Sequence, residues 1–185
     1  MNYAIIVAAG KSTRMKKNIQ KVFIPLLGKP VIYYTIKNFN DCGLIDGIIV
    51  VGQKGDIKKL NEIKKTYGFH KIRKFVVGGK ERQDSVYNGL RSLGNAKNDD
   101  IIVVHNGSNP LVAENEIIGC ISAAKKFDAA VAGFPLKDTI KKISNDFVDK
   151  TIDRKGIYQI QTPQAIKYSL FMEAFKNAKK KRLKV

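Results

Sequence analysis

Short apolar runs alternate with amphipathic segments along most of the chain. The runs, rich in Ile, Val and Ala, cover residues 3–9, 47–52, 73–77, 100–104 and 129–134. Because polar residues do not alternate within them, they are typical of strands buried on both faces of a parallel sheet. The segments between them predict helices, so the chain is expected to fold as a doubly wound, mostly parallel α/β sheet. In such a sheet, ligands bind at the carboxyl ends of the strands.

Four of the predicted helices can be placed by local signals. Apolar residues three or four positions apart mark the buried face of the first three. Pro30 opens the first, Gly94 ends the second, and the third places Ile117 and Ile121 on one face. A last helix is expected from about residue 168 to residue 180.

Beyond Pro135 the pattern changes to two short segments, residues 139–143 and 147–152, around Ser144-Asn145-Asp146. This arrangement predicts a two-stranded excursion with a turn at the polar triplet. We therefore expect one domain, residues 1–185, with an arm at about 136–155 that projects from its body. Such an arm often pairs with a second subunit, and a simple surface hairpin is an equally good interpretation.

The charge of the chain is strongly basic, with 34 Lys and Arg, 16 Asp and Glu, and a formal net charge of +18. Such a charge occurs in nucleic-acid binders, but the lysines are scattered rather than gathered in one stripe, which favours a solvated surface. The same field suits an anionic small molecule. No apolar run approaches the ~20 residues of a membrane helix, and the pattern of a signal peptide is absent. Cys42 and Cys120 form no C-x-x-C pair, so neither a disulfide framework nor a zinc site is indicated. Together, these features predict a cytoplasmic protein without nucleic-acid or membrane partners.

The end of the first predicted strand is the most informative segment. There Ala8-Ala9-Gly10 leads into a polar loop with several cations, among them Arg14 and Lys21. Small residues allow a ligand to approach the backbone closely, and the N–H groups of the backbone can then bind phosphate oxygens. The cationic side chains can neutralise the charge of a polyphosphate. Gly10-Lys11-Ser12 does not complete a P-loop, because that motif needs a glycine where Ile5 stands. The segment predicts a nucleoside-triphosphate site.

Three further segments carry candidate chemistry. The pair Gly78-Gly79 precedes a helix, where free N–H groups could bind an anion or the glycines could simply form a turn. His105 follows the strand at 100–104 and could act as a general base or as a structural hydrogen-bonding residue. Arg154, beside Asp153, could grip a phosphate or form a surface ion pair.

Taken together, these segments resemble the signature blocks of the 2-C-methyl-D-erythritol 4-phosphate cytidylyltransferases. The blocks occur in the family's order over residues 3–165, and their joint occurrence is specific although each alone is weak. They comprise Ala8-Ala9-Gly10 with Arg14-Met15 and Lys21, Pro25-Leu26-x-Gly28-Lys29-Pro30, Gly78-Gly79, Arg82-Gln83-Asp84-Ser85-Val86, Asn88-Gly89-Leu90, Asp138-Thr139-Ile140-Lys141, Thr151-x-Asp153-Arg154 and Gln161-Thr162-Pro163-Gln164. The resemblance implies a Rossmann-like nucleotidyltransferase sheet with a short β-arm.

The implied reaction transfers a cytidylyl group from CTP to 2-C-methyl-D-erythritol 4-phosphate and releases pyrophosphate, in non-mevalonate isoprenoid synthesis. By resemblance, Arg14 and Lys21 stabilise the negative charge that builds at the α-phosphate. The residues implied to hold the nucleotide are Ala8, Ala9, Gly10, Gly79 and Ser85. Thr139 and Arg154 are implied to bind the substrate phosphate in the other subunit's site, because the family forms homodimers through the arm.

A ribitol-5-phosphate cytidylyltransferase, on the same fold and with the same chemistry, is the alternative. That group tends to carry Asn-Glu-Thr where this chain has Gln83-Asp84-Ser85. It also lacks the order Asp153-Arg154, so the two segments favour the methylerythritol enzyme.

The chain departs from the family at functional positions. Asn106 stands in place of an aspartate that helps to bind Mg²⁺, and Asn109 in place of an arginine. An amide oxygen can still coordinate a hard cation, so weak Mg²⁺ binding at Asn106 is expected. Family members continue for some tens of residues past the position of Val185, so the C-terminal part of the family domain is expected to be missing. A truncated, non-catalytic nucleotide-binding relative therefore stays open beside the enzyme.

Overall fold

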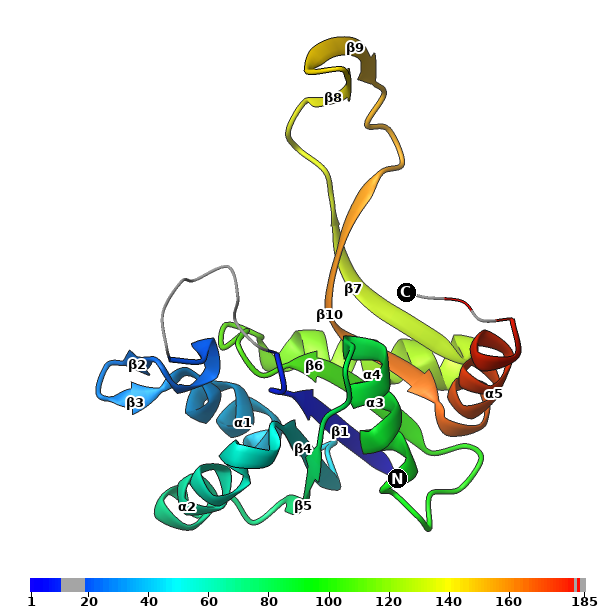
Figure 1. Cartoon of the computed structure of the whole chain (residues 1–185). Coiled ribbons are helices and arrows are strands. Elements are labelled where there is room, and N and C mark those ends of the chain that lie inside the picture. The colour runs from blue at the N-terminus through cyan, green and yellow to red at the C-terminus, as the bar shows by residue number, and fades with distance from the viewer. Residues whose placement is uncertain (11–18, 182, 184–185) are drawn as a thin grey trace.

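The structure, a computed structural model, describes residues 1–10, 19–181 and 183. Its main sheet has the strand order β5-β4-β1-β6-β10-β7 (Figure 1). The bounds are β1 (Asn2–Val7), β4 (Gly47–Gly52), β5 (Ile72–Val77), β6 (Ile101–Asn106), β7 (Ala129–Pro135) and β10 (Tyr158–Lys167). The first four of these strands pair in parallel, whereas β10 is antiparallel to both β6 and β7. The mostly parallel sheet that the sequence predicts is therefore confirmed.

Helices cover both faces of this sheet. They are α1 (Val31–Asp41), α2 (Ile57–Tyr67), α3 (Arg82–Arg91), α4 (Glu114–Phe127) and α5 (Tyr168–Lys180), with the short 3₁₀ turns η2 (Lys21–Phe23) and η3 (Lys54–Asp56). Ala4 and Ile6 of β1 face the cluster that contains α1, α2 and α4. Tyr3 and Ile5 face the opposite cluster, against which α3 and α5 pack. Alternate residues of one strand thus fill two cores, which explains why its sequence is apolar without alternation.

The five strands predicted from apolar runs are present, but β10 was not predicted. Its middle reads Gln161-Thr162-Pro163-Gln164, which is polar and contains a proline, and such a sequence argues against a central strand. The structure accommodates this segment at an irregularity, because the register with β7 shifts between Ile160 and Gln164. Beyond it Ala165 is fully buried, so the strand is anchored by packing rather than by a period-two pattern.

Strands β7 and β10 extend beyond the body of the sheet and carry a hairpin at their far end (Figure 1). This hairpin consists of β8 (Ile140–Ser144) and β9 (Phe147–Ile152). Asn145 and Asp146 connect them with φ values of 50° and 66°, a left-handed conformation that Asn and Asp tolerate better than most residues. The predicted turn is therefore found. A second small hairpin pairs β2 (Pro25–Leu26) with β3 (Lys29–Pro30).

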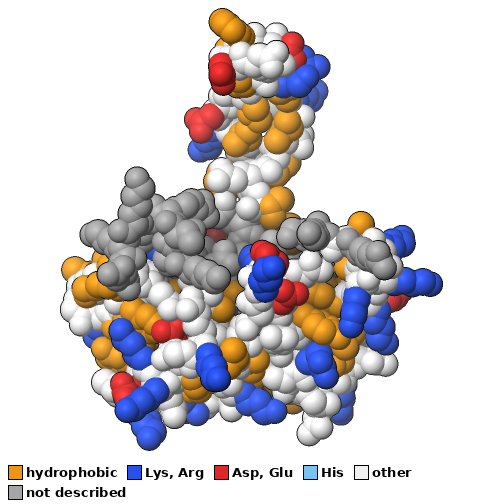
Figure 2. Space-filling view, in the orientation of Figure 1, with side chains coloured by type: hydrophobic (Ala, Val, Ile, Leu, Met, Phe, Trp, Pro, Cys, Tyr) orange, Lys and Arg blue, Asp and Glu red, His pale blue; other side chains and the backbone are white. Residues whose placement is uncertain are grey.

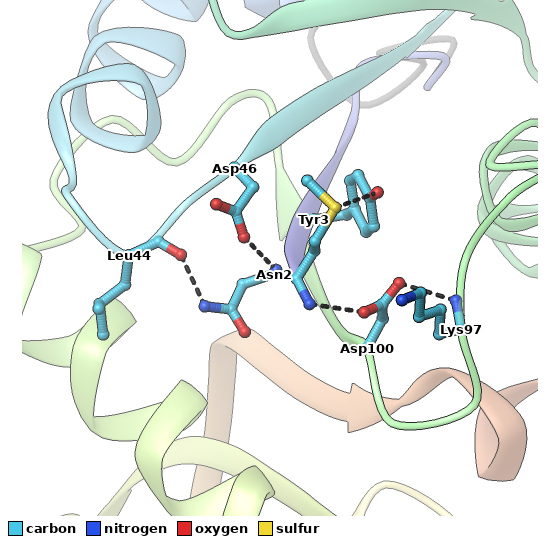
Figure 3. Close-up of polar contacts among 7 residues, drawn as sticks. Asn2, Tyr3, Leu44, Asp46, Lys97 and Asp100 are labelled. Carbon is cyan, nitrogen blue, oxygen red and sulfur yellow. Dashed lines mark hydrogen bonds and ion pairs between the residues drawn. The ribbon is translucent and has the colours of Figure 1, made fainter.

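Polar contacts fix the start of β1 at the centre of the sheet (Figure 3). Asp100 is 4% exposed and accepts hydrogen bonds from the Met1 ammonium at 2.5 Å and from the Lys97 amide at 2.8 Å. Asn2 donates through its backbone N–H to Asp46 and through its side chain to the Leu44 carbonyl. These contacts set the position of β1 and hence of the loop at its other end.

Basic side chains are spread over the visible face of the body rather than gathered in one patch (Figure 2). Within the described residues, no helix combines the length and the apolar character that crossing a membrane requires.

Candidate active site

A cavity of about 500 Å³ opens at the carboxyl ends of β1, β4, β5 and β6. This is where a doubly wound sheet places its ligands. The lining comes from the segments that follow these strands and from η2, and it comprises Val7, Ala8, Ala9, Gly10, Lys21, Val22, Gln53, Lys54, Val77, Gly78, Gly79, Lys80, Glu81, Arg82, Ser85, Asn106 and Ser108. The five residues predicted to hold the nucleotide, Ala8, Ala9, Gly10, Gly79 and Ser85, are therefore brought together here with Lys21 and Asn106.

The backbone after β1 is held from both sides. The Ala8 amide donates to the Val51 carbonyl at 2.7 Å, and the Gly107 amide donates to the Val7 carbonyl at 2.8 Å. A Cβ atom on Gly107 would lie 3.1 Å from the Ala8 Cβ. Small residues are therefore needed where these two loops touch. Among the described residues, no atom occupies the space that a Cβ atom on Gly10 would take, so these residues leave the backbone there accessible to a ligand.

The loop after β5 is equally tight. A Cβ atom on Gly78 would lie 2.4 Å from the Ala9 Cβ, and one on Gly79 would lie 2.2 Å from the Asp84 Cβ. The buried Ser85 hydroxyl accepts from the Gly79 amide at 3.1 Å and donates to the Glu81 carbonyl at 3.2 Å. The glycine pair is thus required by the packing of two loops, and Ser85 fixes the shape of the second loop.

The electrostatic character of the cavity is positive. Four cationic side chains line it, from Lys21, Lys54, Lys80 and Arg82, against the carboxylate of Glu81. Lys21 is half-buried at the start of η2. Such a cavity attracts a polyanion, because converging charges of one sign raise the local concentration of the opposite ion. Arg14, the other predicted catalytic cation, lies outside the described residues.

The described residues do not fit a protein-held Mg²⁺. Asn106 lines the cavity, and its Oδ1 accepts a hydrogen bond from Arg82 Nη2 at 3.3 Å. The one amide oxygen expected to approach a cation therefore already faces a guanidinium. Within residues 1–10, 19–181 and 183, no three His, Cys, Asp or Glu side chains form a group that could hold a metal ion. Hard divalent cations prefer several oxygen ligands, usually including carboxylates.

His105 has a structural environment. It is fully buried, its Nε2 lies 2.9 Å from the Asn109 carbonyl, and its ring centroid lies 5.0 Å from that of Phe39. Because Nε2–H donates to this carbonyl, Nδ1 is the unprotonated nitrogen of the neutral ring. Burial lowers the pKa of His105, which favours the neutral form. The side chain shapes the loop after β6 and does not line the cavity, so the structural interpretation of this histidine is the one that holds.

Thr139 and Arg154 do not line the cavity of their own chain. Both are exposed within the arm, next to the β8–β9 hairpin, and the Arg154 guanidinium donates to the Lys137 carbonyl. Several other residues line the cavity without a role predicted from the sequence, among them Gln53, Lys54 and Arg82. Gln53 donates to the Ala9 carbonyl at 3.3 Å and so supports the first loop. Its position directly after a predicted strand was the signal available for it.

Comparison with known proteins places the chain among relatives of one name. The family profile of 2-C-methyl-D-erythritol 4-phosphate cytidylyltransferase matches residues 2–185. The protein of that name from Clostridium acetobutylicum is 44% identical over 182 residues, covering 97% of this chain and 78% of that protein. The one from Geobacillus thermodenitrificans is 40% identical over 181 residues, with 97% and 78% covered. The crystal structure of 4-diphosphocytidyl-2C-methyl-D-erythritol synthase from Anaerococcus prevotii superposes with a TM-score of 0.84 at 31% identity, covering 100% of this chain and 77% of that one. These names favour the methylerythritol enzyme over the ribitol-5-phosphate alternative.

Proposed function

The chain belongs to the 2-C-methyl-D-erythritol 4-phosphate cytidylyltransferase family, and we propose that its cavity binds CTP and carries the cytidylyl transfer. In this reaction an oxygen of the substrate's phosphate attacks the α-phosphorus of CTP in line. A new P–O–P bond forms as the bond between the α- and β-phosphates breaks, and pyrophosphate leaves with the electron pair. The observation that carries the proposal is the convergence of the predicted nucleotide-holding residues on one cationic cavity.

The proposed nucleotide contacts follow from the loop geometry. Ala8, Ala9 and Gly10 present a backbone with little side chain around it, and Gly79 does the same across the cavity. The Ala8 and Gly79 amides already donate to the Val51 carbonyl and the Ser85 hydroxyl, and these bonds fix the two loops. We therefore assign the phosphate oxygens to the N–H groups of Ala9 and Gly10, which a fixed loop offers without a cost of reorganisation. Ser85 supports this arrangement through its bond to the Gly79 amide.

The proposed catalytic cations are Lys21 and Arg14. Phosphoryl transfer needs little covalent chemistry from the protein, so positioning and charge stabilisation carry the rate. Lys21 borders the cavity in a half-buried position, where a charge acts more strongly than at the surface. Loss of one such stabilising group typically lowers kcat about 10²–10³-fold.

The proposed role of Mg²⁺ is small, because the described cavity residues offer few oxygen ligands. Since Asn106 offers one oxygen that Arg82 already uses, we assign no step of the reaction to a metal held by the chain. Any Mg²⁺ would be bound mainly by the phosphates of CTP itself, with Asn106 at most a weak ligand.

The proposed partner is a second copy of the chain. Thr139 and Arg154 are exposed in the arm and do not line the cavity, which suits residues that complete the site of another subunit. The arm also exposes Ile143, Phe147 and Val148 at 55%, 78% and 61%. In a homodimer these apolar side chains would be covered. We further propose that the protein acts in the cytoplasm, as one domain with this arm.

The test is a pyrophosphate-release assay with CTP, run in parallel with 2-C-methyl-D-erythritol 4-phosphate and ribitol 5-phosphate. Release with the first substrate and not the second is the expected result. Calorimetric titration of CTP in the absence of the second substrate separates binding from turnover. Binding without release would identify a non-catalytic nucleotide-binding protein, and neither binding nor release from folded protein would overturn the proposal.

A further inference from the structure

Arg82 occupies a defined position at the edge of the cavity. It is the first residue of α3, directly after a turn in which the Glu81 amide donates to Asp84 Oδ2 at 3.0 Å. This turn sets the direction in which the side chain leaves the helix. The guanidinium then reaches the end of β6, where Nη2 donates to Asn106 Oδ1 at 3.3 Å. Two strand ends, those of β5 and β6, are bridged by this contact across the cavity wall.

The charge of Arg82 is not balanced by its neighbour. Asn106 is neutral, and among the described residues no carboxylate forms an ion pair with Arg82. A guanidinium has five N–H donors in a planar fork, and the contact with Asn106 uses one of them. The remaining donors match the oxygens of a phosphate, which arginine binds in a bidentate manner. As far as the described residues go, a positively charged group is therefore held at the cavity with most of its hydrogen-bond donors available.

We infer that Arg82 binds a phosphate group of the substrates and that Asn106 is its positioning residue. The inference rests on the proposed binding of CTP in this cavity. It gives Asn106 a role that needs no metal: the amide orients the guanidinium without neutralising it. A carboxylate at the same position would orient Arg82 equally well but would cancel its charge, so the neutral side chain is what makes Arg82 available to an anion.

The first experiment replaces Arg82 and follows each phosphate source separately. Arg82→Ala is expected to weaken CTP binding at least tenfold by calorimetry if the triphosphate is the partner, with CMP binding much less affected. If the partner is the polyol phosphate, KM for that substrate rises at least tenfold while the CTP dissociation constant stays the same. Arg82→Lys should recover part of the loss, since the charge stays while the fork is lost.

The matched control is Arg91→Ala, which removes an exposed arginine from the last turn of the same helix, outside the cavity. It should leave both constants within twofold of the wild type. Circular dichroism and thermal unfolding establish that each variant is folded. If folded Arg82→Ala retains both constants within threefold of the wild type, the inference is overturned.

The second experiment tests the pairing with Asn106 and uses Asn106→Asp in the presence of a metal chelator. In the protein that retains Arg82, this change should weaken CTP or substrate binding several-fold, because the new carboxylate neutralises the guanidinium. In the Arg82→Ala background the same change should have a clearly different effect, so the double-mutant cycle reports a coupling. Equal effects in both backgrounds would remove Asn106 from its positioning role. Failure of the wild-type protein to bind CTP would instead refute the proposed function, so the two failures are distinguishable.

Discussion

At the scale of single residues, the candidate site depends on glycines with different surroundings. Gly79 has no space for a side chain, since a Cβ atom would lie 2.2 Å from the Asp84 Cβ and 3.2 Å from its backbone carbonyl carbon. No atom of the residues that the structure describes lies within 4 Å of the place a Cβ atom on Gly10 would take. Two glycines that look alike in the sequence are thus held by different constraints, one by packing and one by its exposure to the cavity.

We expect Gly79→Ala to lower the free energy of unfolding by about 1–3 kcal/mol, because the added methyl group forces the start of α3 to move. Gly10→Ala is the matched control for stability and should change it by less than about 0.5 kcal/mol. Chemical denaturation of both variants measures the difference. Equal stabilities would contradict the packing constraint at Gly79.

A pH effect is expected from Asp100. Burial alone raises the pKa of this carboxyl, but the hydrogen bonds from the Met1 ammonium and the Lys97 amide outweigh burial and lower the pKa below its ordinary value of 3.8. Because the folded-state pKa lies below the unfolded one, Asp100 contributes stability above the unfolded value, and this contribution is lost as the pH falls through the folded value. Asp100→Asn should therefore destabilise the protein by about 1–3 kcal/mol at pH 7.

The measurement is a series of thermal unfolding curves from pH 7 down to pH 3. Below about pH 4 the gap between wild type and Asp100→Asn should narrow. A gap that stays constant over this range would show that the charge of Asp100 contributes nothing to stability.

At the scale of elements, α1 positions the loop that closes one side of the cavity. The buried Thr35 hydroxyl donates to the Gly107 carbonyl at 3.0 Å. The Asn38 side chain donates to the carbonyls of Pro110 and Val112, each at 3.0 Å. The loop after β6 is thereby attached to a helix some 70 positions earlier in the chain. The shape of this loop therefore depends on tertiary contacts and not on its own sequence alone.

Asn38→Ala should loosen this loop, because both carbonyls lose a donor at a partly buried site. We expect faster amide hydrogen exchange over residues 107–113 and a loss of about 1–2 kcal/mol in unfolding free energy. Lys37→Ala, at the exposed neighbouring position, is the control and should leave exchange in this loop unchanged. Unchanged amide exchange in Asn38→Ala would mean that contacts other than those of Asn38 keep the loop ordered.

The same distinction explains what the sequence could predict. Strands such as β1 and β6 are recognisable because both their faces are buried, so that their sequences are apolar throughout. The polar stretch from Gln161 to Gln164 of β10 shows no such apolar pattern. Its place in the sheet depends on pairing with β6 and β7, which are distant in the chain. In the site, the small residues Ala8 to Gly10 were recognisable from their position after a strand. The contact of Arg82 with Asn106 was not, because it joins the start of α3 to the end of β6, and the distance between these two points depends on how the sheet is assembled.

At the scale of the whole molecule, the separation of the arm from the cavity is the feature that bears on assembly. Strands β7 and β10 carry β8 and β9 well away from the body (Figure 1), and the arm displays apolar side chains along its length (Figure 2). An isolated two-stranded hairpin is only marginally stable in water. Contacts with a second subunit would both cover these side chains and bring the arm to another cavity.

Subunit complementation tests this arrangement directly. Lys21→Ala removes a proposed catalytic cation from the cavity, and Arg154→Ala removes the proposed phosphate ligand from the arm. Each variant alone should have strongly reduced turnover. If Arg154 serves the partner's cavity, a heterodimer of the two variants contains one site with both wild-type residues. Unfolding and refolding an equal mixture should therefore restore roughly a quarter of wild-type activity, because half of the dimers are mixed and each has one intact site. Wild-type protein refolded in the same way corrects for incomplete recovery. If the mixture stays as inactive as its components, either Arg154 acts within its own chain or the chains do not exchange, and mass measurement of tagged heterodimers separates these two outcomes.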